Sequence, residues 1–181
     1  MPAAAPQGKP MLRSWFWGPL SPLGLGTAAF TVLGDQVHKT WMLHVYDIGA
    51  KGTVTLTPYF DLVLVWNRGI SYGLLAQDSA LGRWGLILFA FGASLALAAW
   101  LARLDSRLAA ASVGLIIGGA IGNAIDRILY GAVADFFSFH AFGYQWYVFN
   151  IADTAIVAGV VGLLYDSLFR GHKKAGKPTK M

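Results

Sequence analysis

The sequence contains no cysteine and no glutamate, and charged residues make up only 13% of its 181 positions. That share is about half of what soluble domains usually carry. Without cysteine there is no disulfide, no thiolate nucleophile and no cysteine-ligated zinc or iron–sulfur site. Any carboxylate chemistry must therefore use one of the nine aspartates.

Apolar residues, at 56% of the chain, gather in four runs at about 14–34, 84–102, 108–125 and 146–169. A helix needs roughly 20 such residues to cross a bilayer. The first run is also compatible with a cleaved signal peptide, but its length, its prolines and the lack of a clear small-residue cleavage site favour an uncleaved span. The sequence predicts an all-α membrane protein with four transmembrane helices, forming a single membrane-embedded domain over 14–169.

Lysine and arginine are unevenly distributed over the segments outside these runs. Nine of the 14 lie in the N-terminal segment 1–13, the short link 102–107 and the basic tail 170–181, and the other five are spread over the longer loops. This bias predicts that both termini are cytoplasmic and that the long loops face outward. Anchoring to membrane lipids explains the basic tail better than a nucleic-acid partner does. The first 13 residues, rich in proline, alanine and glycine, are expected to be a flexible cytoplasmic segment.

The first outer loop carries a β-rich stretch at about 52–67. Val54 and Leu56 alternate with threonines, and a run of β-branched and aromatic residues follows Pro58. These are strand signals, and they are apolar on both faces. Soluble loops rarely expose so much apolar surface, so we expect a small extracytoplasmic β-sheet, or cradle, on the outer leaflet. A hairpin that only caps the helix bundle is the alternative.

Two polar clusters stand at the outer ends of the third and fourth runs, and each contains Asn-x-x-Asp. Because residues i and i+3 share a helix face, Asn123 is expected to support Asp126, and Asn150 to support Asp153. Arg127 joins the first of these faces, and nearby glycines allow close helix packing. An ionisable residue at membrane depth is costly to bury, which makes these clusters candidates for function.

A third acid, Asp135, lies in the aromatic connection between these clusters, where it can fold back toward Asp153. Two aspartates held close together share one proton, so the ionised one can activate water while the protonated one polarises a carbonyl. That arrangement permits peptide hydrolysis without a metal. The same acids also suit a small proton-coupled transporter or channel, or buried structural ion pairs. Spacing alone pairs Asp126, not Asp135, with Asp153.

Two more polar groups lie near the outer ends of the runs. Asp35 and Lys39 are four residues apart and can pair, either as a helix-end salt bridge or as part of a site. Asn67 follows the β-rich stretch and either turns its amide toward a substrate backbone or only shapes the turn.

Taken in order, these residues resemble the bacterial lipoprotein signal peptidase family, also called signal peptidase II. The motifs are Asp35-Gln-x-x-Lys39, Asn67-Arg-Gly-x-Ser-x-Gly73, Gly118-Gly-Ala-x-Gly-Asn-x-x-Asp-Arg127, Val133-x-Asp-Phe136 and Phe149-Asn-x-Ala-Asp153. Each motif is weak by itself, but all five in order within a four-span chain are specific. The segment before Arg13 is longer than the family needs, and Ala134 stands where a bulkier residue is common.

The resemblance implies an aspartic endopeptidase of the bacterial inner membrane, acting as a monomer, with no cofactor or metal and its active site near the periplasmic face. Its implied substrate is a diacylglyceryl-modified prolipoprotein, cut just before the lipidated cysteine. The implied catalytic pair is Asp135 and Asp153. The implied supporting and substrate-binding residues are Asp35, Lys39, Asn67, Gly69, Asn123, Asp126, Arg127 and Asn150.

Overall fold

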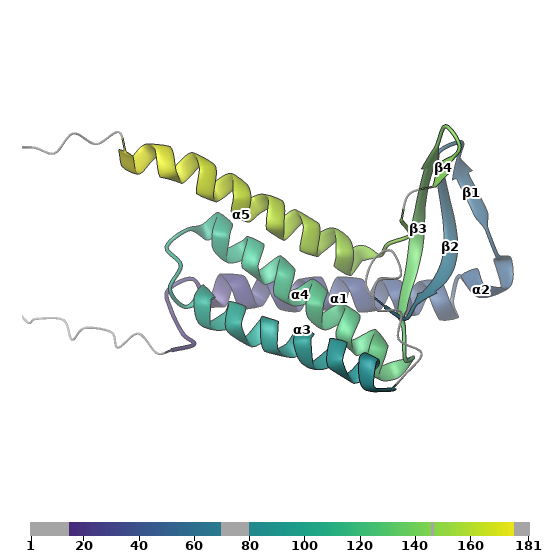
Figure 1. Ribbon diagram of the computed structural model, residues 1–181, viewed down its shortest axis with the longest axis horizontal. Coiled ribbons are helices and arrows are strands. Elements are labelled where there is room, and N and C mark those ends of the chain that lie inside the picture. Colours follow the sequence, from purple (N-terminus) through teal and green to yellow (C-terminus); the bar gives the residue numbers. More distant parts are fainter. Residues whose placement is uncertain (1–14, 70–79, 146, 176–181) are drawn as a thin grey trace, which may run out of the picture.

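The computed structural model describes residues 15–69, 80–145 and 147–175; the expected N-terminal segment 1–13 and the end of the basic tail lie outside them. Four long helices lie side by side, namely α1 (Ser21–His44), α3 (Ala80–Leu101), α4 (Arg107–Leu129) and α5 (Ile151–Ala175). A short helix, α2 (Ile48–Lys51), follows α1. Figure 1 shows a small sheet standing across one end of this bundle.

The sheet is antiparallel, with the order β1-β2-β3-β4. Its strands are β1 (Val54–Thr57), β2 (Phe60–Asn67), β3 (Val133–Ala141) and β4 (Tyr144–Gln145). The strands predicted from the β-rich stretch are present as β1 and β2. The sequence did not predict β3, whose residues were expected to form only a connection. Most of the β3 side chains are buried, whichever face of the strand they are on, so β3 lacks the alternation that marks a half-exposed strand.

The first helix differs from the prediction of a span at 14–34, because it begins at Ser21 and continues to His44. Proline is favoured in the first turn of a helix, and Pro22 stands there. At the other end, Asp35 and Lys39 do not terminate the helix. Their side chains are paired with each other and buried, so the helix can continue through them.

Helix α4 is the central element of the bundle, with α1, α3 and α5 packed around it. Its glycines make this possible. A Cβ at Gly118 would lie 2.7 Å from the backbone oxygen of Ala28 on α1, and one at Gly119 would lie 2.4 Å from the backbone oxygen of Ala152 on α5. The close packing predicted from these glycines is confirmed, and α1 and α5 both approach α4 to backbone contact.

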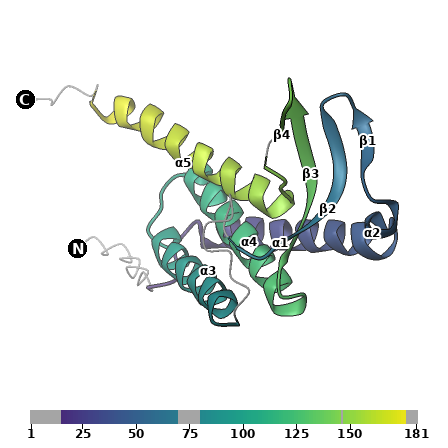
Figure 2. The ribbon, with the colours of Figure 1, turned by 45° about the vertical axis from the view of Figure 1, so that its right-hand side comes forward.

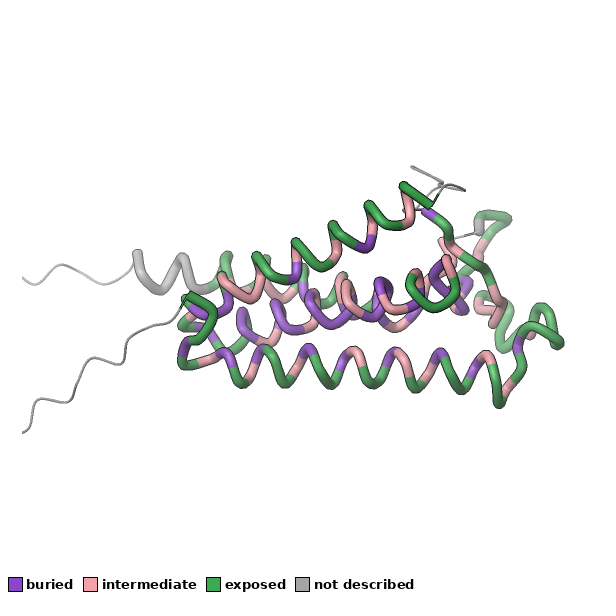
Figure 3. Tube along the Cα trace, turned by 90° about the horizontal axis from the view of Figure 1, so that it is seen from below, coloured by how far each residue is buried: buried purple, intermediate pink, exposed green. Residues whose placement is uncertain are grey.

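Large apolar side chains on the outer faces of the helices are exposed, among them Phe89 at 75% and Val157 at 62%. In Figure 3 the buried positions follow the inner faces, and the outer faces of the helices are largely exposed. Within the described residues, α3, α4 and α5 are long and apolar enough to cross a membrane. The structure is therefore mostly helical, with three candidate spans and a small antiparallel sheet.

Both ends of the described chain and the link between α3 and α4 lie at the end of the bundle opposite the sheet (Figures 1 and 2). The guanidinium of Arg103, in that link, lies 5.7 Å from the ring centre of Trp15. The described parts of the segments predicted to be cytoplasmic are thus at one end, and the sheet is at the other.

Candidate active site

The polar residues singled out from the sequence converge where the sheet meets the helix bundle. They come from five elements: α1, the end of β2, α4, β3 and the start of α5. Ser71 and Gly73, which belong to the second motif, lie outside the described residues. Most of the converging side chains are buried, and they contact one another through a continuous set of hydrogen bonds.

Asp153 and Asn150 form a reciprocal cap at the N-terminus of α5. The backbone N–H of Asp153 donates to the Asn150 side-chain oxygen at 3.0 Å, and the backbone N–H of Asn150 donates to the Asp153 carboxylate at 3.3 Å. This is the geometry of a capping box, with Asn at the N-cap and Asp at the third helical position. Asn150 therefore supports Asp153 as expected, but from the residue before the helix and not from a shared helix face.

Asp135 lies on β3 and is only 1% exposed. Its carboxyl group accepts hydrogen bonds from the Asn150 amide at 2.6 Å and from the Asn67 amide at 3.1 Å. Asn150 thus contacts both acids at once, Asp135 through its side-chain nitrogen and Asp153 through its backbone nitrogen and side-chain oxygen. The two carboxyl groups that the family resemblance singles out therefore both contact one asparagine.

Burial, and after it repulsion by the neighbouring Asp153 carboxylate, raises the pKa of Asp135 to about 7. The hydrogen bonds from Asn150 and Asn67 and the charge of Lys39 act in the opposite direction without cancelling the effect. A carboxyl group with such a pKa holds its proton for much of the time at neutral pH. This is the protonation state that an acid needs in order to donate to a substrate.

Lys39 stands at the centre of a second, fully buried cluster. Its ammonium group lies 2.8 Å from Asp35 and 2.9 Å from Asp126, and it donates to the Asn123 side-chain oxygen at 3.2 Å. Asp35 also accepts from the backbone N–H of Ala152, at the start of α5. The salt bridge expected between Asp35 and Lys39 is present, but inside the bundle instead of at a helix end. It ties α1 to the segment that carries Asp153.

Asp126 has partners different from those expected from spacing. It is completely buried and accepts from Lys39, from the Gln36 amide at 2.9 Å and from the backbone N–H of Ala134 at 3.0 Å. Asn123 turns its amide toward Asp153, to which it donates at 2.8 Å, and not toward Asp126. Asn123 therefore supports Asp126 only indirectly, through Lys39, which contacts both side chains.

Arg127, Asn67 and Gly69 connect β2 to α4. The Arg127 guanidinium donates to the backbone oxygen of Gly69 at 3.0 Å and to that of Asn123 at 3.3 Å. Asn67 accepts from the backbone N–H of Gly69 at 3.1 Å while its amide nitrogen contacts Asp135. Asn67 therefore shapes the turn, as one of the two alternatives held, and it also binds one of the acids.

Two residues of this network were missing from the predicted site. Gln36 donates to both Asp35 and Asp126, and the Tyr147 hydroxyl accepts from the Asn67 amide. Gln36 was detectable, since an amide next to an aspartate in an apolar helix needs partners when it is buried. Tyr147 carries no comparable signal, because aromatic residues are common at membrane interfaces.

A groove of about 660 Å³ runs along α5 from Asp153. Its other lining residues are Tyr147, Phe149, Thr154, Ile156, Val157, Ala158 and Val161. We call it the Asp153 groove. Asp153 is its one acidic lining residue and most of the others are apolar, so a peptide lying in it would pass beside the Asp153 carboxyl group.

Comparison with known proteins decides the family. The family model described as signal peptidase (SPase) II matches residues 27–169, which include all ten predicted site residues. The chain belongs to the signal peptidase II family. It is 55% identical over 151 residues to a lipoprotein signal peptidase of Nitrobacter hamburgensis, covering 81% of this chain and 92% of that protein. It is 54% identical to one from Methylobacterium sp. over 81% of this chain and 89% of that protein.

A solved structure described as a bacterial membrane enzyme has a similar fold, with a TM-score of 0.73 and 26% identity over 88% of this chain and 95% of that one. Family membership and the apolar helices together make this signal peptidase II relative a multi-pass membrane protease. The resemblance stated from the five motifs is confirmed.

Proposed function

We propose that this chain is an aspartic endopeptidase that removes signal peptides from diacylglyceryl-modified prolipoproteins, cutting just before the lipidated cysteine. The observation that carries the proposal is the contact of Asn150 with both Asp135 and Asp153, which brings two carboxyl groups together beside a groove. The lipoprotein signal peptidases to which the chain is similar supply the class of substrate.

The chemistry follows from one proton shared between the two acids. Asp135, with a pKa near neutral, holds the proton and donates it to the carbonyl oxygen of the scissile bond. Asp153 accepts a proton from a water molecule as the water oxygen bonds to the carbonyl carbon. When the C–N bond breaks, this proton passes to the leaving amine of the cysteine, and Asp135 recovers its own from the tetrahedral intermediate. The signal peptide leaves with a new carboxyl group.

The remaining residues of the site hold the pair in place. Asn150, Asn123 and Asn67 donate to the carboxyl groups. Lys39, between Asp35 and Asp126, holds α1 and α4 together below them. A transporter or channel using the same acids is less well supported, because the core cluster farther down the bundle, formed by Ala28, Leu101, Ala110, Val113 and Ile117, is apolar.

We further propose that α1 is a fourth transmembrane helix and that 14–169 is one membrane-embedded domain, active as a monomer. At 1.5 Å per residue, the 24 residues of α1 extend about 36 Å, enough to cross the hydrocarbon core. Its charged residues are neutralised within the bundle. The sheet then lies at the periplasmic face of the inner membrane, and both termini are cytoplasmic.

The test is cleavage of a defined precursor by the purified chain in detergent or lipid. We expect it to cut a diacylglyceryl-modified prolipoprotein and to leave the same precursor without lipid intact, with mass spectrometry placing the cut directly before the cysteine. Equal cleavage of the unlipidated precursor would refute the lipid requirement. A folded protein that leaves the lipidated precursor intact would refute the function.

A further inference from the structure

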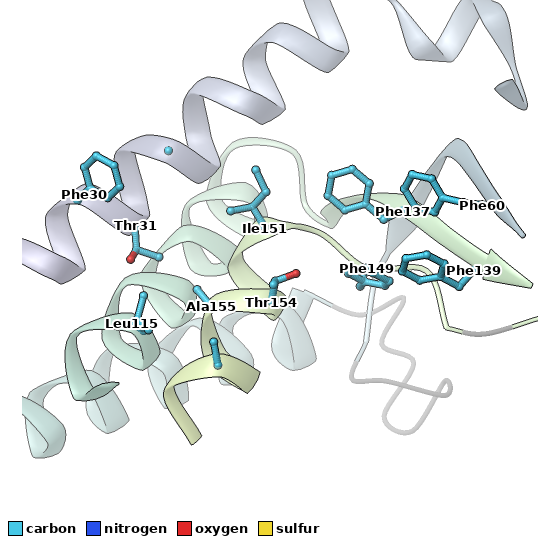
Figure 4. A pocket seen from close by; sticks show the side chains of 12 residues that line it. Phe30, Thr31, Phe60, Leu115, Phe137, Phe139, Phe149, Ile151, Thr154 and Ala155 are labelled. Carbon is cyan, nitrogen blue, oxygen red and sulfur yellow. The ribbon is translucent and has the colours of Figure 1, made fainter. Parts of the chain in front are cut away.

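A second groove, of about 600 Å³, lies between α1, α4 and α5 where they meet the sheet. We call it the phenylalanine groove, because Phe60, Phe137, Phe139 and Phe149 form its end at the sheet (Figure 4). Phe30 and Thr31 of α1, Leu115 of α4, and Ile151, Thr154 and Ala155 of α5 form its sides, as the close-up shows. Gly34 and Ala158 complete the lining.

The phenylalanine groove offers almost no hydrogen bonds to an occupant. Its two hydroxyl-bearing residues use their donors within their own helices: Thr31 donates to the backbone oxygen of Thr27, and Thr154 donates to that of Asn150, both within 3.0 Å. A peptide backbone buried there would leave its polar groups without hydrogen-bond partners, which is unfavourable. A hydrocarbon chain has no such groups, so the groove suits an acyl chain.

The two grooves lie on either side of the first turns of α5. They share Phe149, Thr154 and Ala158, while Asp153 lines only the Asp153 groove. If the proposed function is right, two apolar parts diverge from the scissile bond: the signal segment before it and the diacylglyceryl group on the cysteine after it. Two grooves that meet beside Asp153 match two diverging parts.

We propose that the phenylalanine groove receives an acyl chain of the substrate's diacylglyceryl group, and that Gly34 determines how long a chain it accepts. This inference rests on the proposed function and concerns the same site. An acyl chain leaving the bilayer for the groove gains little from the hydrophobic effect, since lipid tails are equally apolar. The groove can therefore distinguish acyl chains only by whether they fit. A larger side chain that fills part of the groove should exclude long acyl chains.

Gly34 is suited to test this. Gly34 lines the groove, and a Cβ added there meets nothing within 4 Å, so a larger side chain at this position has room without displacing neighbours. Gly26 provides a matched control, because it lies on the same helix, a Cβ there also meets nothing within 4 Å, and it lines neither groove. Both substitutions replace an exposed helical glycine by leucine.

The experiment compares wild type, Gly34→Leu and Gly26→Leu on one precursor carrying either two palmitoyl or two hexanoyl chains. We expect Gly34→Leu to lower kcat/KM for the palmitoyl form by about tenfold, as overpacking an apolar site does. The hexanoyl form should stay within about twofold, the usual range for a surface substitution. Gly26→Leu should leave both forms within that range.

Three results would overturn the inference. No change with Gly34→Leu would mean that the groove holds only bulk lipid. Equal losses of kcat/KM on both precursors would mean that the groove holds peptide, or that the substitution disturbs the two acids. Leu115→Phe, which fills the groove from α4, must reproduce the chain-length effect; if it does not, Gly34 acts elsewhere. Failure of the wild type on both precursors would instead refute the proposed function.

Discussion

Asn150 is the residue on which the arrangement of the two acids depends. Its side-chain nitrogen donates to Asp135 and to Asn123, its side-chain oxygen accepts from the backbone of Asp153, and its backbone nitrogen donates to the Asp153 carboxylate. An alanine there would remove three of these four contacts.

At this scale the sequence predicted which polar residues converge but not how they pair. The Asn-x-x-Asp spacing suggested two similar helix faces, whereas Asn150 is a cap outside its helix and Asn123 lies inside one. Spacing within one element carries no information about a partner on another, so the preference for Asp135 over Asp126 came from the family resemblance. The buried position of Asp126 against Lys39 supplies the physical reason.

The raised pKa of Asp135 makes a prediction about stability. The folded state keeps the Asp135 proton up to about pH 7, whereas an unfolded chain loses it near 3.8. Between these values the folded state binds more protons, so this residue makes the wild type less stable as the pH rises, by as much as about 1.4 kcal/mol per pH unit. Asp135→Asn cannot ionise and escapes the penalty.

We therefore expect the melting temperature of Asp135→Asn, relative to wild type, to rise from pH 4.5 to pH 7 and then to level off. Thermal unfolding of the two purified proteins in the same detergent measures it. Thr55→Ser, an exposed change on β1, serves as the control for general pH effects. A difference that stays constant over this range would show that Asp135 titrates normally.

Among the elements, α4 determines how the site is assembled. Its glycines allow α1 and α5 to approach, and that approach brings Asp35 and Lys39 of α1 and Asp153 of α5 against Asn123 and Asp126.

The three predicted helices after α1 agree with the structure because apolar runs of that length are unambiguous. Hydropathy could not predict that α1 continues through Asp35 and Lys39, because this depends on the salt bridge between them. It could not predict β3, because side chains on both faces of that strand are buried.

Gly119 provides the test at this scale. A Cβ there would lie 2.4 Å from the backbone oxygen of Ala152, next to Asp153. Gly119→Ala should therefore push α5 away, destabilise the fold by about 1–3 kcal/mol as overpacking does, and lower the cleavage rate. Gly92→Ala on α3, where a Cβ meets nothing within 4 Å, should instead stabilise by roughly 0.5–1 kcal/mol. Denaturant unfolding and the cleavage rate of both variants test this prediction. A Gly119→Ala protein as stable and active as wild type would contradict the close packing of α5 on α4.

In the molecule as a whole, the polar site lies at the end of the bundle that carries the sheet, and the described parts of the basic segments lie at the other end (Figure 2). A peptidase acting on lipid-anchored substrates needs its acids near a membrane surface, because the anchored bond cannot leave it. The basic-residue bias predicts that this surface is the outer one. The Lys/Arg bias in the sequence and the positions of the sheet and the described chain ends in the structure are independent observations, and both give this orientation.

Labelling of single cysteines tests this orientation, and the absence of native cysteine makes the background clean. Thr55→Cys lies on β1, and Arg107→Cys lies at the start of α4; both positions are exposed. In intact spheroplasts an impermeant maleimide should label position 55, and position 107 should react only after lysis. The reverse pattern would invert the proposed topology.

The most direct test of the central claim is single-turnover cleavage of a diacylglyceryl prolipoprotein by Asp135→Asn, Asp153→Asn and the double variant. Each substitution keeps the size of the side chain and removes a titrating group. We expect all three proteins to fold, and each single variant to lose cleavage as completely as the double one, because residues that act as a unit are not additive. Near-normal cleavage by either folded single variant would remove that aspartate from the mechanism and contradict the account.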